Sequence, residues 1–213
     1  MRNGIGTKVR GMLGLATLVV ALAVPGAANA GLLTGILSTQ SASYCDPEVA
    51  QYFGPWGDSA WYRLVPGGRF EGSHGWSLSG GAKVVSGNEP WYLKGRSDSR
   101  SLSLPAGSTA TSPTTCFDFG DWHARFLVRN TGSTSGTLEV DILVRSLVGV
   151  LSVLDGGTIK AGSAWKPSPQ VSALVTNVGG LLGTTSVSFR LRARGTGAAF
   201  QVDDVFLDPF RSR

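Results

Sequence analysis

Histidine, cysteine and methionine are scarce in this chain, which has only two residues of each kind among its 213. The two histidines, His74 and His123, are isolated in the sequence, so they do not form the cluster of three or four ligands that a transition-metal site needs. The chain also has no run of Lys or Arg residues, which argues against nucleic-acid binding. No segment after residue 30 has the pattern of an amphipathic helix, which favours an all-β fold.

The first 30 residues have the pattern of an export signal. Arg2, Lys8 and Arg10 form a positively charged beginning, residues 12–24 are apolar, and residues 28–30 form a small-residue cleavage site. The apolar run is shorter than the ~20 residues that a membrane-spanning helix requires, and no second run of that length follows. We therefore expect a secreted, extracellular protein with no membrane span after cleavage of the signal.

The remaining 183 residues are enough for one well-buried domain. Three of the 19 basic residues and none of the 14 acidic residues lie in the signal, so the mature chain has 16 basic residues against 14 acidic ones. The 30 glycines suit many short strands joined by tight turns. We expect an N-terminal arm over residues 31–43 and a single domain over residues 44–213.

Cys45 and Cys116 are the only cysteines, and outside the cytoplasm a lone pair is expected to form one disulfide. In the chain-entropy model such a bridge stabilises the fold by about 4 kcal/mol. The alternative is a nucleophilic cysteine, which requires contact with His74 or His123 as a base.

Three segments alternate regularly between apolar and polar residues, a pattern that predicts β-strands: residues 124–130, 137–145 and 186–194. In the last two, the outward positions include three arginines and two acids, namely Arg190, Arg192, Arg194, Glu139 and Asp141.

Shorter strands are expected near residues 61–65, 82–86, 90–94, 100–104, 115–119, 148–154, 171–175 and 200–207, and a single helical turn or short helix within 171–182. About ten short strands separated by turn residues argue for a sandwich of two sheets.

Two motifs, one at each end of this strand-rich region, resemble the first and last strands of bacterial carbohydrate-binding jelly-roll modules. The first is Phe70-Glu71-Gly72-Ser73-His74-Gly75-Trp76-Ser77-Leu78, followed by Gly80-Gly81-Ala82, and the last is Val202-Asp203-Asp204-Val205. Such modules are appended to glycan-degrading enzymes and are of the xylan- and glucan-binding type. The resemblance implies an all-β, two-sheet antiparallel jelly-roll sandwich (galactose-binding-like) that recognises a polysaccharide or cell-wall polymer.

The middle of the chain, residues 87–107, also resembles a group of secreted actinobacterial proteins of uncharacterised activity. In that group it runs on to a cysteine like Cys116 and to an Arg-Phe strand like Arg125-Phe126. This second resemblance covers most of the mature chain, and it implies no activity or ligand.

The jelly-roll modules often hold a structural Ca²⁺ between their two ends, so the first resemblance implies calcium ligands at Glu71 and at Asp203 or Asp204. Carboxylate and carbonyl oxygens are the ligands that calcium prefers. Adjacent strand residues face opposite sides, so only one of the two aspartates is expected to face the ion. The alternative is that these acids pair with arginines or face water, and no other cofactor is expected.

Four tryptophans are candidates for a glycan-binding surface, because such pockets combine flat aromatic walls with a few polar groups: Trp56, Trp91, Trp122 and Trp165. Trp91 and Tyr92 are expected on one strand, with one ring buried and the other exposed. The other three candidates lie among Gly, Pro, Asp or Lys residues and are expected in loops, which carry most binding residues. Trp76 is expected in the core, and for every ring the alternative is ordinary packing.

The outward charges allow two alternatives. Glu139-Val140-Asp141-Ile142 resembles the start of a catalytic signature in jelly-roll β-glucan hydrolases, but Leu143 and Val144 occupy the positions that should supply the third acid. The arginine row suits an anionic polymer such as a uronate. The preferred interpretation is that these arginines pair with Glu139 and Asp141 across neighbouring strands.

We therefore expect a secreted, non-catalytic binding protein that recognises a glycan or cell-envelope polymer. The alternatives are a structural or protein-interaction role at the cell surface, and an enzyme that acts on a glycan or ester. An enzyme of that kind would show two carboxylates at hydrolase spacing or a Ser-His pair.

Overall fold

The computed structural model describes residues 48–117, 121–146, 149–172 and 185–209. The expected export signal, the arm over residues 31–43 and Cys45 lie outside the described residues, as does most of the short helix expected within residues 171–182. Only the backbone is described for Cys116, so the expected disulfide stays a prediction.

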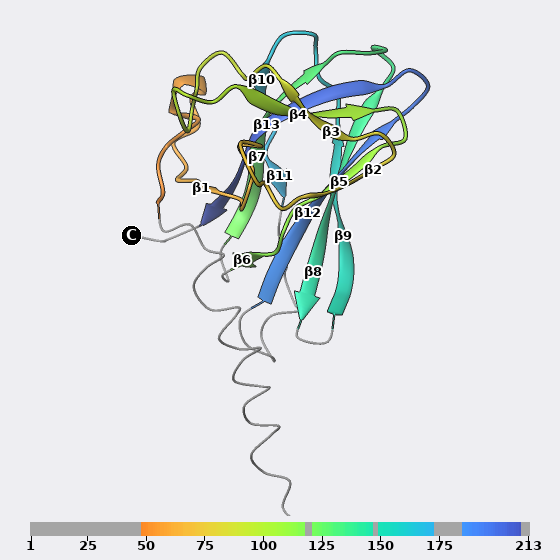
Figure 1. Cartoon of the computed structure of the whole chain (residues 1–213). Coiled ribbons are helices and arrows are strands. Elements are labelled where there is room, and N and C mark those ends of the chain that lie inside the picture. Colours follow the sequence, from red (N-terminus) through yellow and green to blue (C-terminus); the bar gives the residue numbers. More distant parts are fainter. Residues whose placement is uncertain (1–47, 118–120, 147–148, 173–184, 210–213) are drawn as a thin grey trace, which may run out of the picture.

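The described residues form a jelly-roll β-sandwich of two antiparallel sheets (Figure 1). The seven-stranded sheet has the order β10-β7-β13-β4-β3, with β1 on β13 and β11 on β7; its strands are β1 (Arg63–Leu64), β3 (Lys83–Ser86), β4 (Arg100–Pro105), β7 (Asp121–Asn130), β10 (Lys166–Pro167), β11 (Val171–Ser172) and β13 (Ala199–Pro209). The six-stranded sheet has the order β2-β5-β12-β8-β9, with β6 on β12; its strands are β2 (Ser77–Ser79), β5 (Thr109–Thr111), β6 (Thr115–Phe117), β8 (Thr137–Ser146), β9 (Gly149–Ile159) and β12 (Thr185–Arg194).

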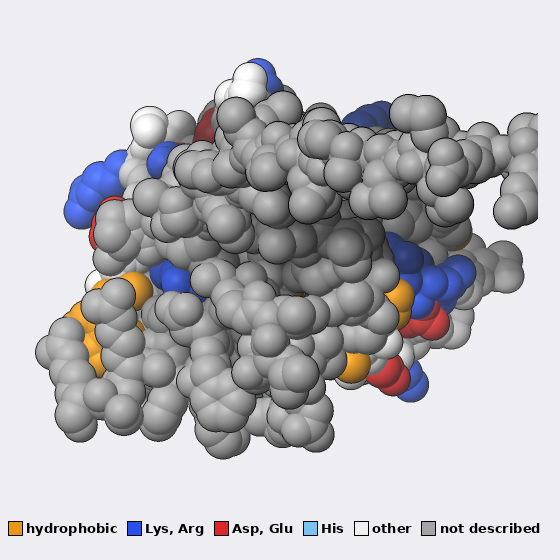
Figure 2. Space-filling model, turned by 90° about the horizontal axis from the view of Figure 1, so that it is seen from below, with side chains coloured by type: hydrophobic (Ala, Val, Ile, Leu, Met, Phe, Trp, Pro, Cys, Tyr) orange, Lys and Arg blue, Asp and Glu red, His pale blue; other side chains and the backbone are white. Residues whose placement is uncertain are grey.

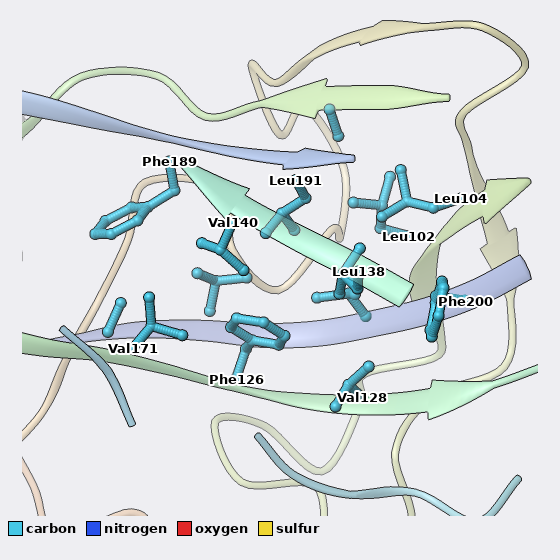
Figure 3. Packing of buried hydrophobic residues seen from close by; sticks show 14 of the residues in the cluster. Leu102, Leu104, Phe126, Val128, Leu138, Val140, Val171, Phe189, Leu191 and Phe200 are labelled. Atoms are coloured by element: carbon cyan, nitrogen blue, oxygen red, sulfur yellow. The ribbon is translucent and has the colours of Figure 1, made fainter. Parts of the chain in front are cut away.

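The core lies between the two sheets and follows the alternation of the long strands. Residues of β8 and β12 that were expected to point inward, such as Val140 and Leu191, are Cα partners across the pair and are buried. They face Phe126 and Val128 of β7, and Phe200 of β13, from the opposite sheet (Figure 3). The predicted β8 and β12 faces are therefore confirmed.

The segment immediately before the first end motif lies beside the strand that contains the last one. Strand β1 pairs with β13, and the turn that follows β1 continues the contact, because Val65 donates to the carbonyl of Val205 and Val205 donates to the carbonyl of Gly68. Gly68 is required here, since a Cβ atom would lie 2.7 Å from the Val205 carbonyl oxygen. Trp76 is buried, as expected, and its indole N–H donates to the Pro66 carbonyl at 3.1 Å.

A bulge in β13 changes which residues face the core. The register with β7 shifts between Asp203 and Phe206, and Asp204 has a φ of +48°, in the left-handed region. A shift of one residue reverses the alternation. As a result Val202 and Val205 both face the core, although three positions separate them.

A second apolar cluster covers the outer face of the seven-stranded sheet. Leu127 of β7 and Phe206 of β13 point away from the main core and pack against Phe53 and Tyr62 from the segment before the sandwich. Phe206 stacks on Tyr52 with ring centroids 4.3 Å apart. The segment over residues 48–65, which the sequence analysis assigned one short strand, therefore forms the cover of this sheet.

Some expected elements differ from the structure. Residues 90–94 do not form a strand: they belong to the loop between β3 and β4, and Tyr92 has a φ of +53°. Trp91 and Tyr92 are consequently both exposed, at 43% and 46%, rather than one buried and one exposed. Two strands were not expected, namely β5 and β10, whereas β2 falls within the motif that resembles the first strand of the jelly-roll modules. Among the described residues, no helix has the length and apolar character needed to cross a bilayer.

Candidate functional site

An aromatic groove of about 370 Å³ lies on the outer face of the seven-stranded sheet. Its walls come from three segments that are far apart in the sequence: the short 3₁₀ helix η1 (Gly54–Trp56), the β3–β4 loop, and the residues leading into β10. Six residues line it, namely Trp56, Trp91, Arg125, Trp165, Lys166 and Pro167. We call it the tryptophan groove.

Trp56 and Trp91 form one wall of the tryptophan groove. Their rings meet edge to face, with centroids 4.8 Å apart and an interplanar angle of 89°. Helix η1 holds Trp56 because Pro55 presets the first turn and Gly57 ends it with a φ of +80°. Trp91 remains 43% exposed, so its ring presents aromatic surface to solvent.

Trp165 and Lys166 form the other wall. The guanidinium of Arg129 lies over the Trp165 ring at 5.1 Å from the centroid, and Arg129 is itself fixed by donating to the Gln201 side chain at 2.7 Å. Lys166 pairs through its backbone with Val128 of β7, and its exposed ammonium has no hydrogen bond or ion pair to any described residue.

The floor of the tryptophan groove is a fixed cation. Arg125 donates from Nε to the Ser168 carbonyl at 2.9 Å, is ion-paired with Asp58, and lies over the Phe53 ring at 4.8 Å. Burial of Asp58 opposes its ionisation, but hydrogen bonds from Tyr62, Ala60 and Arg125 lower the pKa of this carboxyl below its usual value. The Asp58 carboxyl is therefore ionised at neutral pH, and its ion pair holds the Arg125 side chain in place.

Three of the four tryptophans proposed from the sequence thus lie around one groove. Trp56 and Trp165 are in irregular or 3₁₀ segments as expected, and Trp91 is there because its segment is a loop. Trp122 lies in β7 rather than in a loop, and only its backbone is described. Arg125 and Lys166 were missed, although Lys166 follows Trp165 directly, and that adjacency was the available signal.

A group of buried acids lies behind the β13 bulge. Asp203 and Asp204 are 0% and 1% exposed, and burial together with neighbouring acids raises the pKa of Asp203 to about 9 and that of Asp204 to about 7. Asp203 is satisfied by backbone, because Oδ1 accepts from the Asp204 N–H at 2.9 Å and Oδ2 accepts from the Glu89 N–H at 3.3 Å. Both carboxylate oxygens of Asp204 are buried, and neither forms a hydrogen bond of ordinary geometry with a described residue, although the backbone N–H of Lys94 lies near enough to oppose the rise in the pKa of Asp204.

Of the three acids expected to bind calcium, Asp204 fits the expectation best. A buried carboxylate with two unpartnered oxygens calls for a proton or a cation. Glu71 commits one oxygen, Oε1, to the backbone N–H groups of Ser99 and Arg100 at 2.6 and 2.7 Å. Within the described ranges, no three His, Cys, Asp or Glu side chains converge on a common point that would hold a metal ion. Backbone carbonyls would therefore have to complete a calcium site here.

Arg69 supplies positive charge to this buried group. Its guanidinium forms a two-pronged ion pair with Asp98, which is 5% exposed, through Nε at 3.0 Å and through Nη2. The pair with Asp98, opposed by burial and reinforced by the charges of Asp204 and Glu71, raises the pKa of Arg69. Asp98 is thereby neutralised, while Asp204 is not hydrogen-bonded by this arginine.

The outer face of the six-stranded sheet carries paired charges. Arg190 donates to Asp141 at 2.8 Å, Arg192 reaches both Asp141 (2.8 Å) and Glu139 (3.2 Å), and Arg194 donates to Glu139 at 2.8 Å. The prediction that these arginines pair across strands is confirmed. In the view from below, described basic and acidic side chains likewise lie next to one another at the edges of the molecule (Figure 2).

No protein-family model matches the sequence, and no curated protein sequence matches it significantly. Solved structures that superpose on part of it include the CBM22-1 xylan-binding domain of Paenibacillus barcinonensis Xyn10C, at a TM-score of 0.43 and 14% identity over 64% of this chain and 86% of that one. A family 11 carbohydrate-binding module of Clostridium thermocellum gives 0.40 and 18% over 68% and 93%. TmCBM61, solved in complex with β-1,4-galactotriose, gives 0.41 and 17% over 68% and 92%. At these identities and TM-scores the likeness does not establish a shared ligand.

Proposed function

We propose that this protein is a non-catalytic glycan-binding protein whose ligand, a polysaccharide or cell-envelope polymer, lies in the tryptophan groove. The observation that carries the proposal is the convergence of Trp56, Trp91 and Trp165 from three distant segments onto one open surface. A ring that serves only packing is normally covered, whereas Trp91 remains 43% exposed while its edge-to-face contact with Trp56 fixes its orientation.

The chemistry of the groove suits a sugar chain. Flat indole faces pack on the CH surfaces of pyranose rings, and a small number of polar groups accept or donate hydrogen bonds to hydroxyls. Lys166 provides donors at the rim, and Arg125 fixes the floor through its contacts with Asp58 and Ser168. Because Arg125 is held in place before binding, little of its side-chain entropy is lost when a ligand arrives.

The proposal is tested by removing groove tryptophans one at a time. Trp91→Ala and Trp56→Ala should each weaken binding at least ~10-fold, or about 1.4 kcal/mol, in affinity gels or calorimetry with xylan, mixed-linkage glucan and bacterial wall polymers. Trp61→Ala is the matched control, because Trp61 is 41% exposed and does not line the groove. Failure of the wild-type protein to bind any of these polymers, with unchanged Trp fluorescence, would overturn the proposal.

The same panel separates the two alternatives. An enzyme would release reducing ends or a free acid from these polymers, yet the six residues that line the groove include no carboxylate. A protein-interaction role would appear as a crosslinked partner on the exposed Trp91 and Tyr92 surface without polymer retention.

We also propose that the protein acts outside the cytoplasm, on the basis of the export-signal pattern in residues 1–30. The fractionation of a tagged full-length chain tests this: the mature protein should appear in the medium or on the cell wall and should begin near residue 31. Retention of the uncleaved chain inside the cell would count against it.

Calcium binding at Asp204 is a separate proposal, supported by its two unpartnered buried oxygens. Glu71, whose Oε2 atom has no hydrogen bond from the described residues, would contribute a second carboxylate, and a bound ion would neutralise both. Calcium at 100 times its dissociation constant should stabilise the fold by about 2.7 kcal/mol. Thermal unfolding with excess EDTA and then with excess CaCl₂ measures this, and identical melting curves would exclude a bound ion.

A further inference from the structure

Trp91 lies in a loop that has no strand partner to fix it. Residues 87–99 connect β3 to β4, and the base of this loop is closed by a hydrogen bond from Gly87 N–H to the Ser99 carbonyl at 2.8 Å. Tyr92, at φ +53°, turns the backbone sharply beside the ring. Some other contact must therefore hold Trp91 against Trp56.

Glu89 supplies that contact from a wholly buried position. Its Oε2 atom accepts the backbone N–H of Trp91 at 2.5 Å, and its Oε1 atom accepts that of Leu93 at 2.7 Å. Leu93 packs into the apolar cluster on the outer face of the seven-stranded sheet, while Trp91 points into the tryptophan groove. The Glu89 carboxylate thus fixes the backbone of both Leu93, whose side chain points inward, and Trp91, whose ring points outward.

Glu89 is in turn attached to the centre of the sheet. Its backbone N–H donates to Oδ2 of Asp203 at 3.3 Å, and Asp203 belongs to β13, which pairs with both β4 and β7. The loop is therefore tied to the bulge of β13 through two successive side-chain-to-backbone bonds. Both carboxylates are fully buried.

From this arrangement we infer that Glu89 is a positioning residue for the tryptophan groove: it holds Trp91 in the orientation that the ligand requires, without touching the ligand itself. The inference rests on the proposed function, because it assigns the loop's role in that groove. The inference goes beyond the proposed function because it assigns an effect on affinity to Glu89, a buried residue that does not line the groove.

A carboxylate is needed because both of its oxygens accept hydrogen bonds. Glutamine at this position keeps one acceptor and turns an NH₂ group toward the second, part-buried backbone N–H, which then loses its acceptor. The loss of one such bond corresponds to about 1 kcal/mol, or roughly fivefold in an equilibrium constant.

The test uses the full-length secreted protein and the Glu89→Gln variant. Two indoles whose centroids are 4.8 Å apart give an exciton couplet in far-UV circular dichroism, so the couplet reports the Trp56–Trp91 geometry in the absence of any ligand. We expect Glu89→Gln to lose at least half of the couplet while still unfolding cooperatively. Affinity for the polymer that the wild-type protein retains should fall about fivefold.

A double-mutant cycle with Trp91→Ala separates positioning from general weakening. In the Trp91→Ala background, Glu89→Gln should change affinity no further, because the ring that it positions is gone. Glu139→Gln is the matched control, since it removes the same charge from the opposite face and should leave couplet and affinity unchanged. An unchanged couplet in Glu89→Gln, or an equal loss of affinity in both backgrounds, would overturn the inference.

Hydrogen exchange on the wild-type protein keeps the inference testable if Glu89→Gln does not fold. The amides of Trp91 and Leu93 should exchange much more slowly than that of Ser97 in the same loop, for which the structure shows no hydrogen bond to a described residue. Equal exchange rates for all three would overturn the inference. Because the couplet and the exchange rates need no ligand, they also distinguish its failure from a failure of the proposed glycan binding.

Discussion

The two outer faces of the sandwich use their large side chains differently. On the six-stranded sheet, three arginines pair with the two acids Glu139 and Asp141, so that every cation in the row has an acidic partner. On the seven-stranded sheet, aromatic rings cover the strands, and three of them leave an open groove beside Lys166, whose ammonium pairs with none of the residues that the structure describes. The charges of the first face are paired within the protein, whereas the second face retains aromatic surface that a ligand would cover.

Of the changes that test this difference between the two faces, Phe206→Ala should have the largest effect on stability. Phe206 is wholly buried, stacks on Tyr52 at 4.3 Å and meets Phe53 edge-on at 5.7 Å, so its removal leaves a cavity beneath the aromatic cover. We expect a loss of about 3–5 kcal/mol in the free energy of unfolding, measured by urea titration, together with weaker polymer binding. Phe206→Leu should recover part of the stability. A loss under 1 kcal/mol would mean that the cover contributes little to the fold.

The next largest effect is expected from pH. Asp203 and Asp204 at the β13 bulge are buried without an ion pair to a described residue, whereas Glu139 and Asp141 on the charged face pair with arginines. The pKa of Asp204 is raised from 3.8 to about 7, so the folded state retains a proton that the unfolded chain releases. Without calcium, the contribution of Asp204 to the free energy of unfolding should therefore be most favourable below about pH 4. It should fall as the pH rises from about 4 to about 7.

Asp204→Asn sharpens that measurement. An amide cannot ionise, so the variant should lose this part of the pH dependence and should be more stable than the wild type at pH 8 in EDTA. Chemical unfolding at pH 5, 6.5 and 8 measures it. Asp141→Asn, on the charged face, is the control, and parallel pH profiles for wild type and Asp204→Asn would show that the Asp204 carboxyl is not buried in its charged form.

The smallest effect is expected on the charged face itself. The side chains of Arg194 and Glu139 are 46% and 34% exposed, and exposed ion pairs contribute about 0–1 kcal/mol. Arg194→Ala should therefore change stability by less than ~1 kcal/mol and leave polymer binding unchanged, with the difference disappearing in 1 M salt. A loss of binding as large as that of Trp91→Ala would move the ligand site to this face.

The fold was predictable where strands are long. Strands β8 and β12 alternate over nine paired residues, which was enough to assign both faces and to anticipate the arginine–acid pairs. Strands of two or three residues, such as β5 and β10, are too short to show a period, so the sequence carried no signal for them.

The site was predictable in its residue types but not in its loop geometry. Trp91 was expected on a strand because aromatic residues favour strands. That preference was overridden by the carboxylate of Glu89, which takes up the N–H groups of Trp91 and Leu93 that a neighbouring strand would otherwise bind. The Glu89 side chain accepts hydrogen bonds from backbone N–H groups two and four residues later, as a neighbouring strand would. Such local contacts leave no periodic pattern in the sequence.

The bulge was likewise invisible in the sequence. Alternation suggested that only one of Asp203 and Asp204 would be buried, whereas both are: Asp204 lies in the bulge in a left-handed conformation, and the backbone of Glu89 contacts the Asp203 carboxylate from the β3–β4 loop. The residue that fits a metal ligand best is therefore the one whose backbone departs from the strand.

Under the proposed function, the placement of the groove walls on segments outside the long strands separates ligand selectivity from folding. Helix η1 and the β3–β4 loop contribute their tryptophans from outside the sheet ladders, and β10 adds only two residues at an edge. Exchanging these walls would redesign what the protein recognises while leaving the pairing of the long strands intact. The sandwich is thus a scaffold on which new binding specificities are open to laboratory evolution through a handful of loop positions.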